Sequence, residues 1–479
     1  PIPPELEARE HEVRDNLVEG IVVADDSLME RYLEGEEIDV KELEQALAKG
    51  VAEGSVFPVA TGSSTKLIGI DRLARFIADE APPPAAKDGN PAAFVFKTIA
   101  DPYVGRVNVF KVLQGTVRPD VVLTNGRTVA DERLHQIFTL RGRDQEPVAE
   151  VPAGDIAAVA KLSDTGTGDV LAQRGTDINV EPLESPEPVL PIAIRPKSKA
   201  DEDKLATALH RLQDEDTVLR VERNAETHQT LLWGMGEAHI SIALEKLARK
   251  YGVEVDQEDV RVAYRETVSG KAEAEGKYKK QTGGHGQFGV AFLRVEPLER
   301  GSGFEFSDAI VGGAIPRQFI PAVEKGIVET IQHGGALGFP VVDVKVTCYD
   351  GKYHPVDSSE MSFKMAGSLG FKEAAAKARP VLLEPISELV ITVPEAYQGD
   401  VMGDLNSKRG RIQGTAAVGN GEQEITALVP TSEVIRYAID LRSITGGRGR
   451  FVARHSHYDP APPHLADKIV AEAAAAKEG

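Results

Sequence analysis

Hydrophobic residues in the first part of the chain follow a helical spacing. Between residues 4 and 48 they recur every three or four positions, which places them on one face of a helix; they include Leu17, Ile21, Leu28, Tyr32, Leu43 and Leu47. SVFPVATGSS (55–64) is typical of a strand entering a turn, LIGIDRLARFIADE (67–80) of a helix, and APPPAAKDGNP (81–91) of a linker. We therefore expect residues 1–87 to form the last part of an α/β unit.

The hydrophobic pattern changes after residue 88 to short β-rich runs separated by turn signals. These runs are AFVFKTI, RVNVFKVL, VVLT, LHQIFTL and AAVAKL, and DPYVG, QGTVRPD and TNGR lie between them. Short strands at a regular spacing favour a closed or nearly closed β-barrel. This prediction covers residues 88–185.

The segment 186–259 alternates strand, helix, hairpin, helix and strand, the order of a ferredoxin-like βαββαβ unit. The same order returns in residues 384–479, followed by a C-terminal helix. Between these two copies, residues 260–383 open with a long β-rich stretch and continue through a helix, the strand VVDVKVTCYD and a second helix. The predicted fold class is a multidomain α+β and α/β chain of five parts, with an α+β domain at 260–383.

Composition narrows the functional classes. The formal net charge of −20 excludes a generally basic nucleic-acid coat, although basic and acidic residues nearly balance between residues 259 and 382. The single cysteine, Cys348, excludes an intrachain disulfide and suits a reducing compartment, so we expect a cytoplasmic protein. Because no run of about 18 apolar residues occurs, no membrane partner is expected.

Several motifs of enzyme and metal sites are absent from the sequence. It contains no G-x-x-x-x-G-K-[ST] phosphate loop, no N-K-x-D motif, no H-E-x-x-H pair and no G-x-S-x-G elbow. Cys348 lies in an apolar strand, which favours a buried structural thiol over a nucleophile. We therefore expect no catalytic residue, no metal and no cofactor in this chain.

Two loops in the segment 260–383 carry candidate RNA contacts. GKYKKQTGGHGQFG (276–289) sets Lys279 and Lys280 among glycines, which let a backbone approach a phosphate closely. DGKYHPVDSSE (350–360) exposes Lys352, Tyr353 and His354, residue types that pair with phosphate or stack on bases. The alternatives are a hairpin with solvated lysines in the first loop, and in the second a helix N-cap at Asp357 or Ser358 completed by Glu360.

A third group of basic residues lies in the second ferredoxin-like unit. It could hold an RNA backbone, and the alternative is a solvated arginine-rich face; the candidates are Lys408, Arg409, Arg442, Arg448 and Arg450.

Three long segments together resemble the elongation factor G family of translational GTPases. They are AIVGGAIPRQFIPAVEKGI, GFPVVDVKVTCYDGKYHPVDSSEMSFKMAGSLGFKEA and LRSITGGRGRFVARHSHY, and RPKSKADEDKLATALHRLQDED, WGMGEAHI and VAYRETVSG are similar to the family too. The resemblance extends in the family's order to about Tyr458. It implies that residues 1–87 are the C-terminal part of a GTP-binding domain, followed by domains II (88–185), III (186–259), IV (260–383) and V (384–479).

The resemblance also implies partners and site residues. The family's domain IV reaches the ribosomal decoding region during translocation of tRNA and mRNA, and two loops form its tip. The matching residues are Gly283, Gly284, His285, Gly286 and Gln287 in one loop, and Lys352, Tyr353, His354 and Pro355 in the other. Thr61, Gly62, Ser63 and Ser64 fall at the family's guanine-contacting turn, with Ser-Ser in place of Ser-Ala.

The expected partner is therefore the ribosome, with its ribosomal RNA, tRNA and mRNA, and the protein is expected to be a monomer. GTP and Mg²⁺ are implied as cofactors of a full-length parent. Two alternatives stay open at this point: a free-standing ribosome- or RNA-binding module without GTPase activity, and a ribosomal-protection resistance factor.

Overall fold

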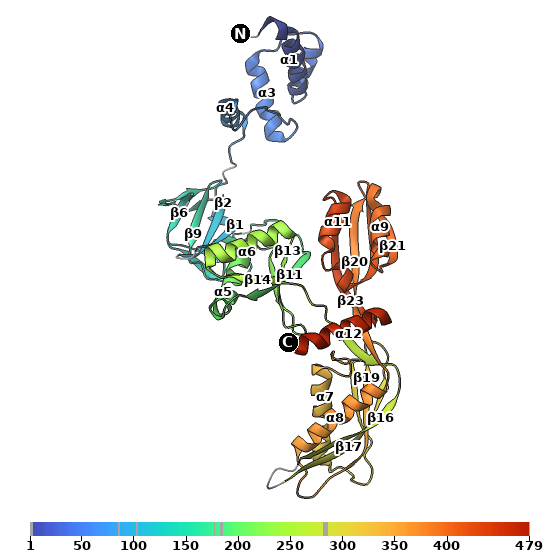
Figure 1. Ribbon diagram of the computed structural model, residues 1–479. Coiled ribbons are helices and arrows are strands. Elements are labelled where there is room, and N and C mark those ends of the chain that lie inside the picture. Colours follow the sequence, from blue (N-terminus) through green and yellow to red (C-terminus); the bar gives the residue numbers. More distant parts are fainter. Residues whose placement is uncertain are drawn as a thin grey trace. The chain divides into compact units, whose positions relative to one another are not determined.

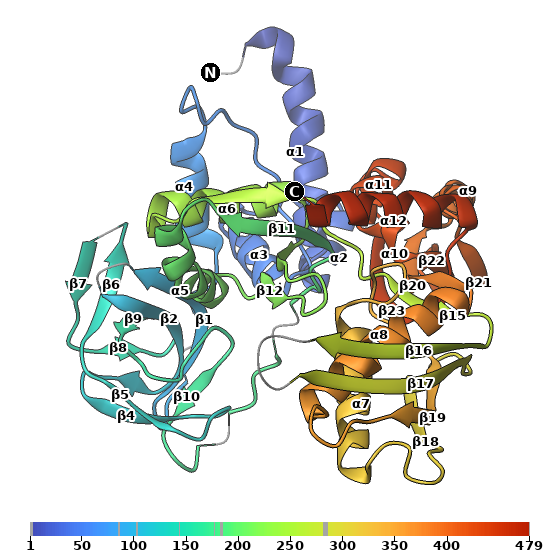
Figure 2. The same cartoon turned by 60° about the horizontal axis from the view of Figure 1, so that its bottom comes forward.

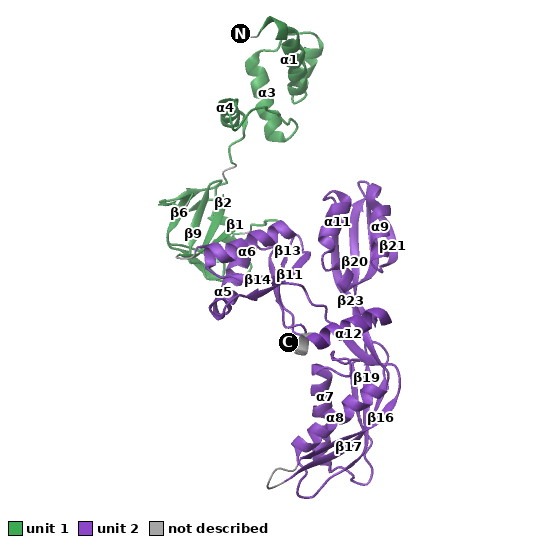
Figure 3. Cartoon of the chain, viewed as in Figure 1, with its two compact units in different colours: residues 1–99, 104–181 green, residues 100–103, 182–479 purple. Residues whose placement is uncertain are grey.

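The computed structural model describes residues 3–84, 87–101, 104–142, 144–176, 178–182, 185–280 and 286–478 (Figure 1). The chain divides into two compact units (Figure 3). The first contains residues 1–99 and 104–181, and the second contains residues 100–103 and 182–479.

The first unit begins with a helical bundle, as the spacing of its apolar residues predicted. Its elements are η1 (Pro4–Leu6), α1 (Glu7–Val22), α2 (Asp26–Leu33), α3 (Val40–Glu53) and α4 (Ile70–Glu80). Ile21, Val22, Leu28 and Ala46 form its small core. This part matches the helical half of the prediction for residues 1–87.

The strand expected within residues 55–64 does not form. In the described part of this bundle only an isolated bridge joins Ser63 to Ile68, and the side chains of Phe57 and Val59 are 81% and 92% exposed. A strand is stabilised by hydrogen bonds to a neighbouring strand, and the described residues around this segment supply none.

The rest of the first unit is a curled antiparallel sheet. Its strands are β1 (Ala92–Asp101), β2 (Gly105–Gln114), β4 (Val121–Asn125), β5 (Asp131–Leu134), β6 (Ile137–Arg141), β7 (Asp144–Pro147), β9 (Ile156–Ala160) and β10 (Val170–Ala172), in the order β5-β4-β10-β1-β2-β9-β6-β7. A short pair, β3 (Thr116–Val117) and β8 (Val151–Pro152), adds to it. Among the described residues, β5 and β7 are the unjoined ends of the sheet, so the predicted barrel is a half-barrel. Phe110, Leu123 and Leu171 lie in its core.

The second unit opens with the predicted ferredoxin-like fold. Its elements are β11 (Leu190–Pro196), α5 (Lys199–Glu215), β12 (Arg220–Arg223), β13 (Thr230–Gly234), α6 (Glu237–Tyr251) and β14 (Val255–Glu258). The sheet order β12-β13-β11-β14 places the first and third strands of the unit in the middle. Leu209, Leu212 and Leu247 pack between the helices and this sheet.

The second copy of this fold lies at the end of the chain. It contains β20 (Pro380–Pro394), η3 (Glu395–Tyr397), α9 (Gln398–Ser407), β21 (Arg411–Gly419), β22 (Glu422–Pro430), α10 (Thr431–Val434), α11 (Tyr437–Thr445), β23 (Arg450–Pro460) and α12 (Pro463–Glu478). Strand β20 pairs with both β22 and β23. Its first residues also pair with β15 (Arg265–Val268), so the boundary expected between residues 383 and 384 falls inside one continuous strand.

Between the two copies lies the α+β segment. Its strands β16 (Ala272–Lys280), β17 (Gln287–Pro297), β19 (Val344–Lys352) and β18 (Phe304–Asp308) form a sheet in that order, with β18 parallel to β19. The helical elements are η2 (Arg317–Phe319), α7 (Ile320–His333) and α8 (Glu360–Lys377), and Figure 2 shows α8 beside this sheet.

Glycines allow these layers to approach closely. A Cβ on Gly276 of β16 would lie 2.0 Å from the carbonyl oxygen of Ala366 in α8, and one on Gly326 of α7 would lie 2.0 Å from that of Lys364. Only glycine fits at either position. Because α8 follows the loop 353–359 directly, its close packing on β16 and β17 holds that loop near the start of β17.

Candidate functional site

The two loops predicted to form a tip meet at the start of β17. The amide of Gly286 donates to Oδ1 of Asp357 at 3.0 Å, and the amide of Phe288 donates to the backbone oxygen of Asp357 at 2.8 Å. The hydroxyl of Ser358 donates to the backbone oxygen of Phe288, also at 2.8 Å. Segments about 70 positions apart in the sequence therefore form one surface.

His354 belongs to this surface and is half-exposed. Its Nδ1 accepts from the backbone amides of Val356 at 3.3 Å and Asp357 at 3.2 Å, and its ring meets the ring of Phe288 edge-on at a centroid distance of 6.5 Å. Lys352, Tyr353 and Pro355 beside it are exposed. The structure thus brings the predicted loop residues 352–355 next to Gly286. Gln287 is exposed at the start of β17, while Gly283, Gly284 and His285 lie outside the described residues.

The helix cap expected in this loop lies one residue further on. Ser359 caps α8, and its capping-box partner is Ser362 rather than Glu360. Asp357 and Ser358 do not cap α8, because the side chain of Asp357 accepts from Gly286 and that of Ser358 is bonded to Phe288 and to the amide of His354.

The tip concentrates positive charge that has no acidic partner in the described chain. Lys277, Lys279, Lys280 and Lys352 are exposed and form no ion pair with a described residue. Basic residues further from the tip, on these strands or directly before β16, are paired: Lys271 with Glu296 at 2.8 Å, Arg294 with Glu273 at 2.8 Å and Lys345 with Glu305 at 2.5 Å. Because unpaired lysines are available to phosphate, the charge at this end of the sheet suits a polyanion.

Register places two of these lysines on one face. Lys277 of β16 and Lys352 of β19 both pair with Val290 of β17, which runs between them. Their side chains point away from α8, since successive residues alternate faces and the preceding Gly276 faces that helix. The two lysines therefore lie on either side of Val290 on the same face of the sheet.

The basic residues of the last ferredoxin-like fold are mostly paired. Lys408 lies 3.0 Å from Asp440 and 3.5 Å from Asp404, and Arg409 contacts both Glu384 and Glu433. Arg450 bonds Glu422, and Arg448 lies over the ring of Tyr397 at 4.8 Å. Arg442 and Arg448 are exposed without an ion pair to a described residue. The expected basic face is thus charge-balanced at Lys408, Arg409 and Arg450.

Thr61, Gly62, Ser63 and Ser64 lie in an exposed turn. Ser63 and Ile68 exchange backbone hydrogen bonds at 3.0 and 3.1 Å, and the hydroxyl of Ser63 accepts from the amide of Lys66 at 3.3 Å. A Cβ on Gly62 would lie 2.8 Å from the backbone oxygen of Ile68, so the turn requires glycine there.

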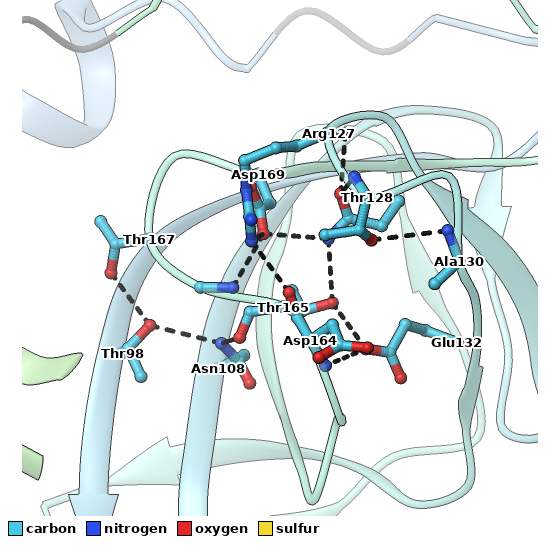
Figure 4. Close-up of polar contacts among 12 residues, drawn as sticks. Thr98, Asn108, Arg127, Thr128, Ala130, Glu132, Asp164, Thr165, Thr167 and Asp169 are labelled. Carbon is cyan, nitrogen blue, oxygen red and sulfur yellow. Dashed lines mark hydrogen bonds and ion pairs between the residues drawn. The ribbon is translucent and has the colours of Figure 1, made fainter. Parts of the chain in front are cut away.

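One polar cluster was not found from the sequence. In the curled sheet, the buried carboxylate of Asp169 accepts hydrogen bonds from Arg127, Asn125 and Gly166. The buried carboxylate of Glu132 accepts from the amides of Ser163 and Asp164 and from the hydroxyl of Thr165. Figure 4 shows this network. Together the two carboxylates hold the loop before β10.

The charge of Asp169 is stabilised by its partners. Burial alone would raise the pKa of Asp169, but hydrogen bonds from Arg127, Gly166 and Asn125 outweigh it and hold that pKa below its ordinary value. The available signal was a polar residue in a row of apolar ones: Asn108, which bonds to Thr165 of this loop, alternates along β2 with Phe110 and Val112 on the core face.

The described residues contain neither a metal site nor a membrane-spanning helix. No group of three or more His, Cys, Asp or Glu side chains within them is arranged to hold a metal ion. Within the same residues, no helix combines the length and the apolar character that crossing a bilayer requires.

Comparison with known proteins gives a consistent pattern along the chain. Residues 90–174 match the family description "Elongation factor G domain 2", 185–259 match "Elongation Factor G, domain III", 260–379 match "Elongation factor G, domain IV" and 381–469 match "Elongation factor G C-terminus".

Individual proteins agree with these matches. The chain is 45% identical over 503 aligned residues to an elongation factor G-like protein of Mycobacterium tuberculosis strain CDC 1551, which covers 97% of this chain and 70% of the relative. The same protein from strain H37Rv gives the same identity and coverage. A crystal structure of a protein from Thermus thermophilus is 41% identical, with a TM-score of 0.72 over 99% of this chain and 71% of that one.

Proposed function

This chain belongs to the elongation factor G family, and on that premise we propose that it binds the ribosome and takes part in the translocation of tRNA and mRNA. The observation that carries the proposal is the basic tip of the α+β segment. Two loops join there through Asp357, and the lysines around them have no acidic partner in the described chain. Unpaired lysines beside an exposed aromatic and an imidazole suit RNA, because they combine phosphate contacts with stacking.

We propose the decoding region of the small ribosomal subunit as the RNA that this tip meets. Tyr353 is 47% exposed and His354 is half-exposed, so both rings are open to a nucleotide. Gly286 precedes Gln287, the residue that pairs with Lys280, so backbone without a side chain lies beside an unpaired lysine. GTP and Mg²⁺ are the cofactors that we propose for a full-length parent, and the protein works as a monomer in the cytoplasm.

Ribosome binding by the chain itself tests the proposal. The double variant Lys352→Glu with His354→Ala should bind ribosomes roughly ten- to a hundredfold more weakly, because a phosphate contact and a ring contact are both lost. Its salt dependence should also become shallower, by about one unit in the slope of log K against log salt for the lost lysine.

Lys271→Glu is the matched control. Lys271 immediately precedes β16 and is exposed, but it is paired with Glu296. Its reversal should leave both affinity and salt slope nearly unchanged. Equal losses from the control and the tip variant, or no loss from either, would contradict the proposed function. Chemical probing of the ribosomal RNA with and without the chain should show protection in the decoding region.

A further inference from the structure

We propose that Asp357 is the positioning residue of the tip, joining the start of β17 to the loop 352–358 and holding His354 in the orientation that meets RNA. This inference rests on the proposed function and deepens it. The sequence left Asp357 or Ser358 as alternative helix caps, and in the structure Ser359 has that role instead.

The contacts of Asp357 are directed at the tip. Its Oδ1 accepts from the amide of Gly286 at 3.0 Å and its Oδ2 lies 3.3 Å from Nδ1 of His354. No other described residue is within hydrogen-bonding or ion-pairing distance of this carboxylate. Since α8 is capped without it, the carboxylate stabilises the arrangement of the two loops rather than the helix.

Gly286 shows that the approach of the loops is tight. A Cβ built there would meet the three carboxyl atoms of Asp357 at 3.1 to 3.3 Å. Such contacts are closer than ordinary packing, so a larger residue would push the carboxylate away. Because Gly286 has no side chain, the carboxylate of Asp357 can reach its amide, and this contact connects the two loops.

The same loop encloses one nitrogen of the His354 ring. Nδ1 faces the amides of Val356 and Asp357 and the carboxylate of Asp357, at 3.2 to 3.3 Å. The amide of His354 in turn donates to the hydroxyl of Ser358 at 2.8 Å, and that hydroxyl donates to Phe288. The ring is thus held at Nδ1 and its backbone at the amide, which leaves Nε2 as the ring nitrogen that can face a phosphate or a base.

Two variants of Asp357 separate positioning from simple loss of a side chain. Asp357→Ala removes the acceptor for Gly286 and should weaken ribosome binding by roughly tenfold. Asp357→Asn keeps an oxygen that can accept the same amide, so it should recover most of the affinity. Amide hydrogen exchange at Gly286 and Phe288 should speed up in the alanine variant and return toward the original rate in the asparagine variant.

A double-mutant cycle with His354 provides the decisive measurement. If Asp357 acts through the position of His354, Asp357→Ala should cost much less affinity in a His354→Ala background. Ser359→Ala is the matched control two residues away: loss of the helix cap should lower stability while ribosome affinity stays unchanged. Exchange at Leu293 in the buried core reports whether each variant remains folded. If Asp357→Ala unfolds, Gly286→Ala replaces it in the cycle, because its added Cβ would displace the Asp357 carboxylate.

The outcomes distinguish this inference from the proposed function. Unchanged ribosome affinity in Asp357→Ala, while His354→Ala binds weakly, would overturn the positioning role alone. An equal loss from Asp357→Ala with and without His354 would overturn it as well. If the Lys352 and His354 variants bind as the original chain does, the proposed function itself fails.

Discussion

The guanidinium of Arg409 lies 2.6 Å from the carboxylate of Glu384, measured from Nη1 to Oε1, and a second contact from Nη2 to Oε2 measures 3.0 Å. Glu384 is only 5% exposed, and it lies on the central strand β20. Glu433 adds a third contact, at 3.1 Å from Nε. The hydrogen bond with Glu384 is the main reason that the pKa of Arg409 is raised. Arg409 therefore has a structural role in the fold that ends the chain.

Arg409→Ala should lower the free energy of unfolding by about 3 kcal/mol, because it leaves the buried carboxylate of Glu384 without its cation. Chemical denaturation followed by circular dichroism would measure this. Arg411→Ala is the control, since Arg411 is exposed and lies 3.6 Å from Asp459; its cost should stay below about 1 kcal/mol. Equal costs for the two variants would contradict the structural role.

Gly326→Ala should separate α7 from α8. The added Cβ would lie 2.0 Å from the backbone oxygen of Lys364, which cannot move without shifting the helix. We expect a loss of stability of about 1–3 kcal/mol, as is typical of overpacking. Gly403→Ala in α9 is the counterpart, because no atom lies within 4 Å of its added Cβ and alanine favours a helix. Thermal unfolding of both variants should show opposite shifts.

The thiol of Cys348 should resist alkylation in the folded protein. It is fully buried in β19, and burial is the main cause that raises its pKa to about 12. Labelling with iodoacetamide should therefore proceed only as fast as the surrounding sheet opens, and it should accelerate in denaturant. Rapid labelling of the native chain at neutral pH would contradict this burial.

Buried Glu266 should make stability depend on pH. Burial raises its pKa above the ordinary 4.5, although amides of residues 336–339 donate to its carboxylate and oppose the shift. A raised pKa in the folded state means that stability is full below pH 4.5 and declines as the pH rises through the folded value. Unfolding free energies measured from pH 4 upward should show this decline, and Glu266→Gln should lack it.

The 479-residue chain should not bind GTP, because its sequence contains neither a phosphate loop nor an N-K-x-D motif. Calorimetric titration with GTP and Mg²⁺ should give no saturable heat. Binding with a dissociation constant below about 100 μM would contradict the prediction, since it would correspond to more than about 5 kcal/mol of binding free energy.

The residue pattern by itself determined the kinds of folding unit and their order. Helical spacing at Leu205, Leu209 and Leu212 and the hairpin that follows were enough to predict the ferredoxin-like fold, because periodicity reports directly which side of a local element is buried. The loops that carry Lys352 and His354 could be chosen for their residue types alone. Neighbours in the sequence decide such features, and no distant contact is needed.

Only the tertiary structure decided which distant residues meet. The alternation of residues 55–64 predicted a strand, yet a strand forms only where another supplies its hydrogen bonds. The arginine-rich run at Lys408 and Arg409 was compatible with an RNA-binding face until Glu384, Asp440 and Glu433 were found against it. Likewise, the carboxylate of Asp357 could cap α8 or join Gly286. The choice between them depends on how closely α8 packs on β16 and β17, which is set by contacts between residues far apart in the chain.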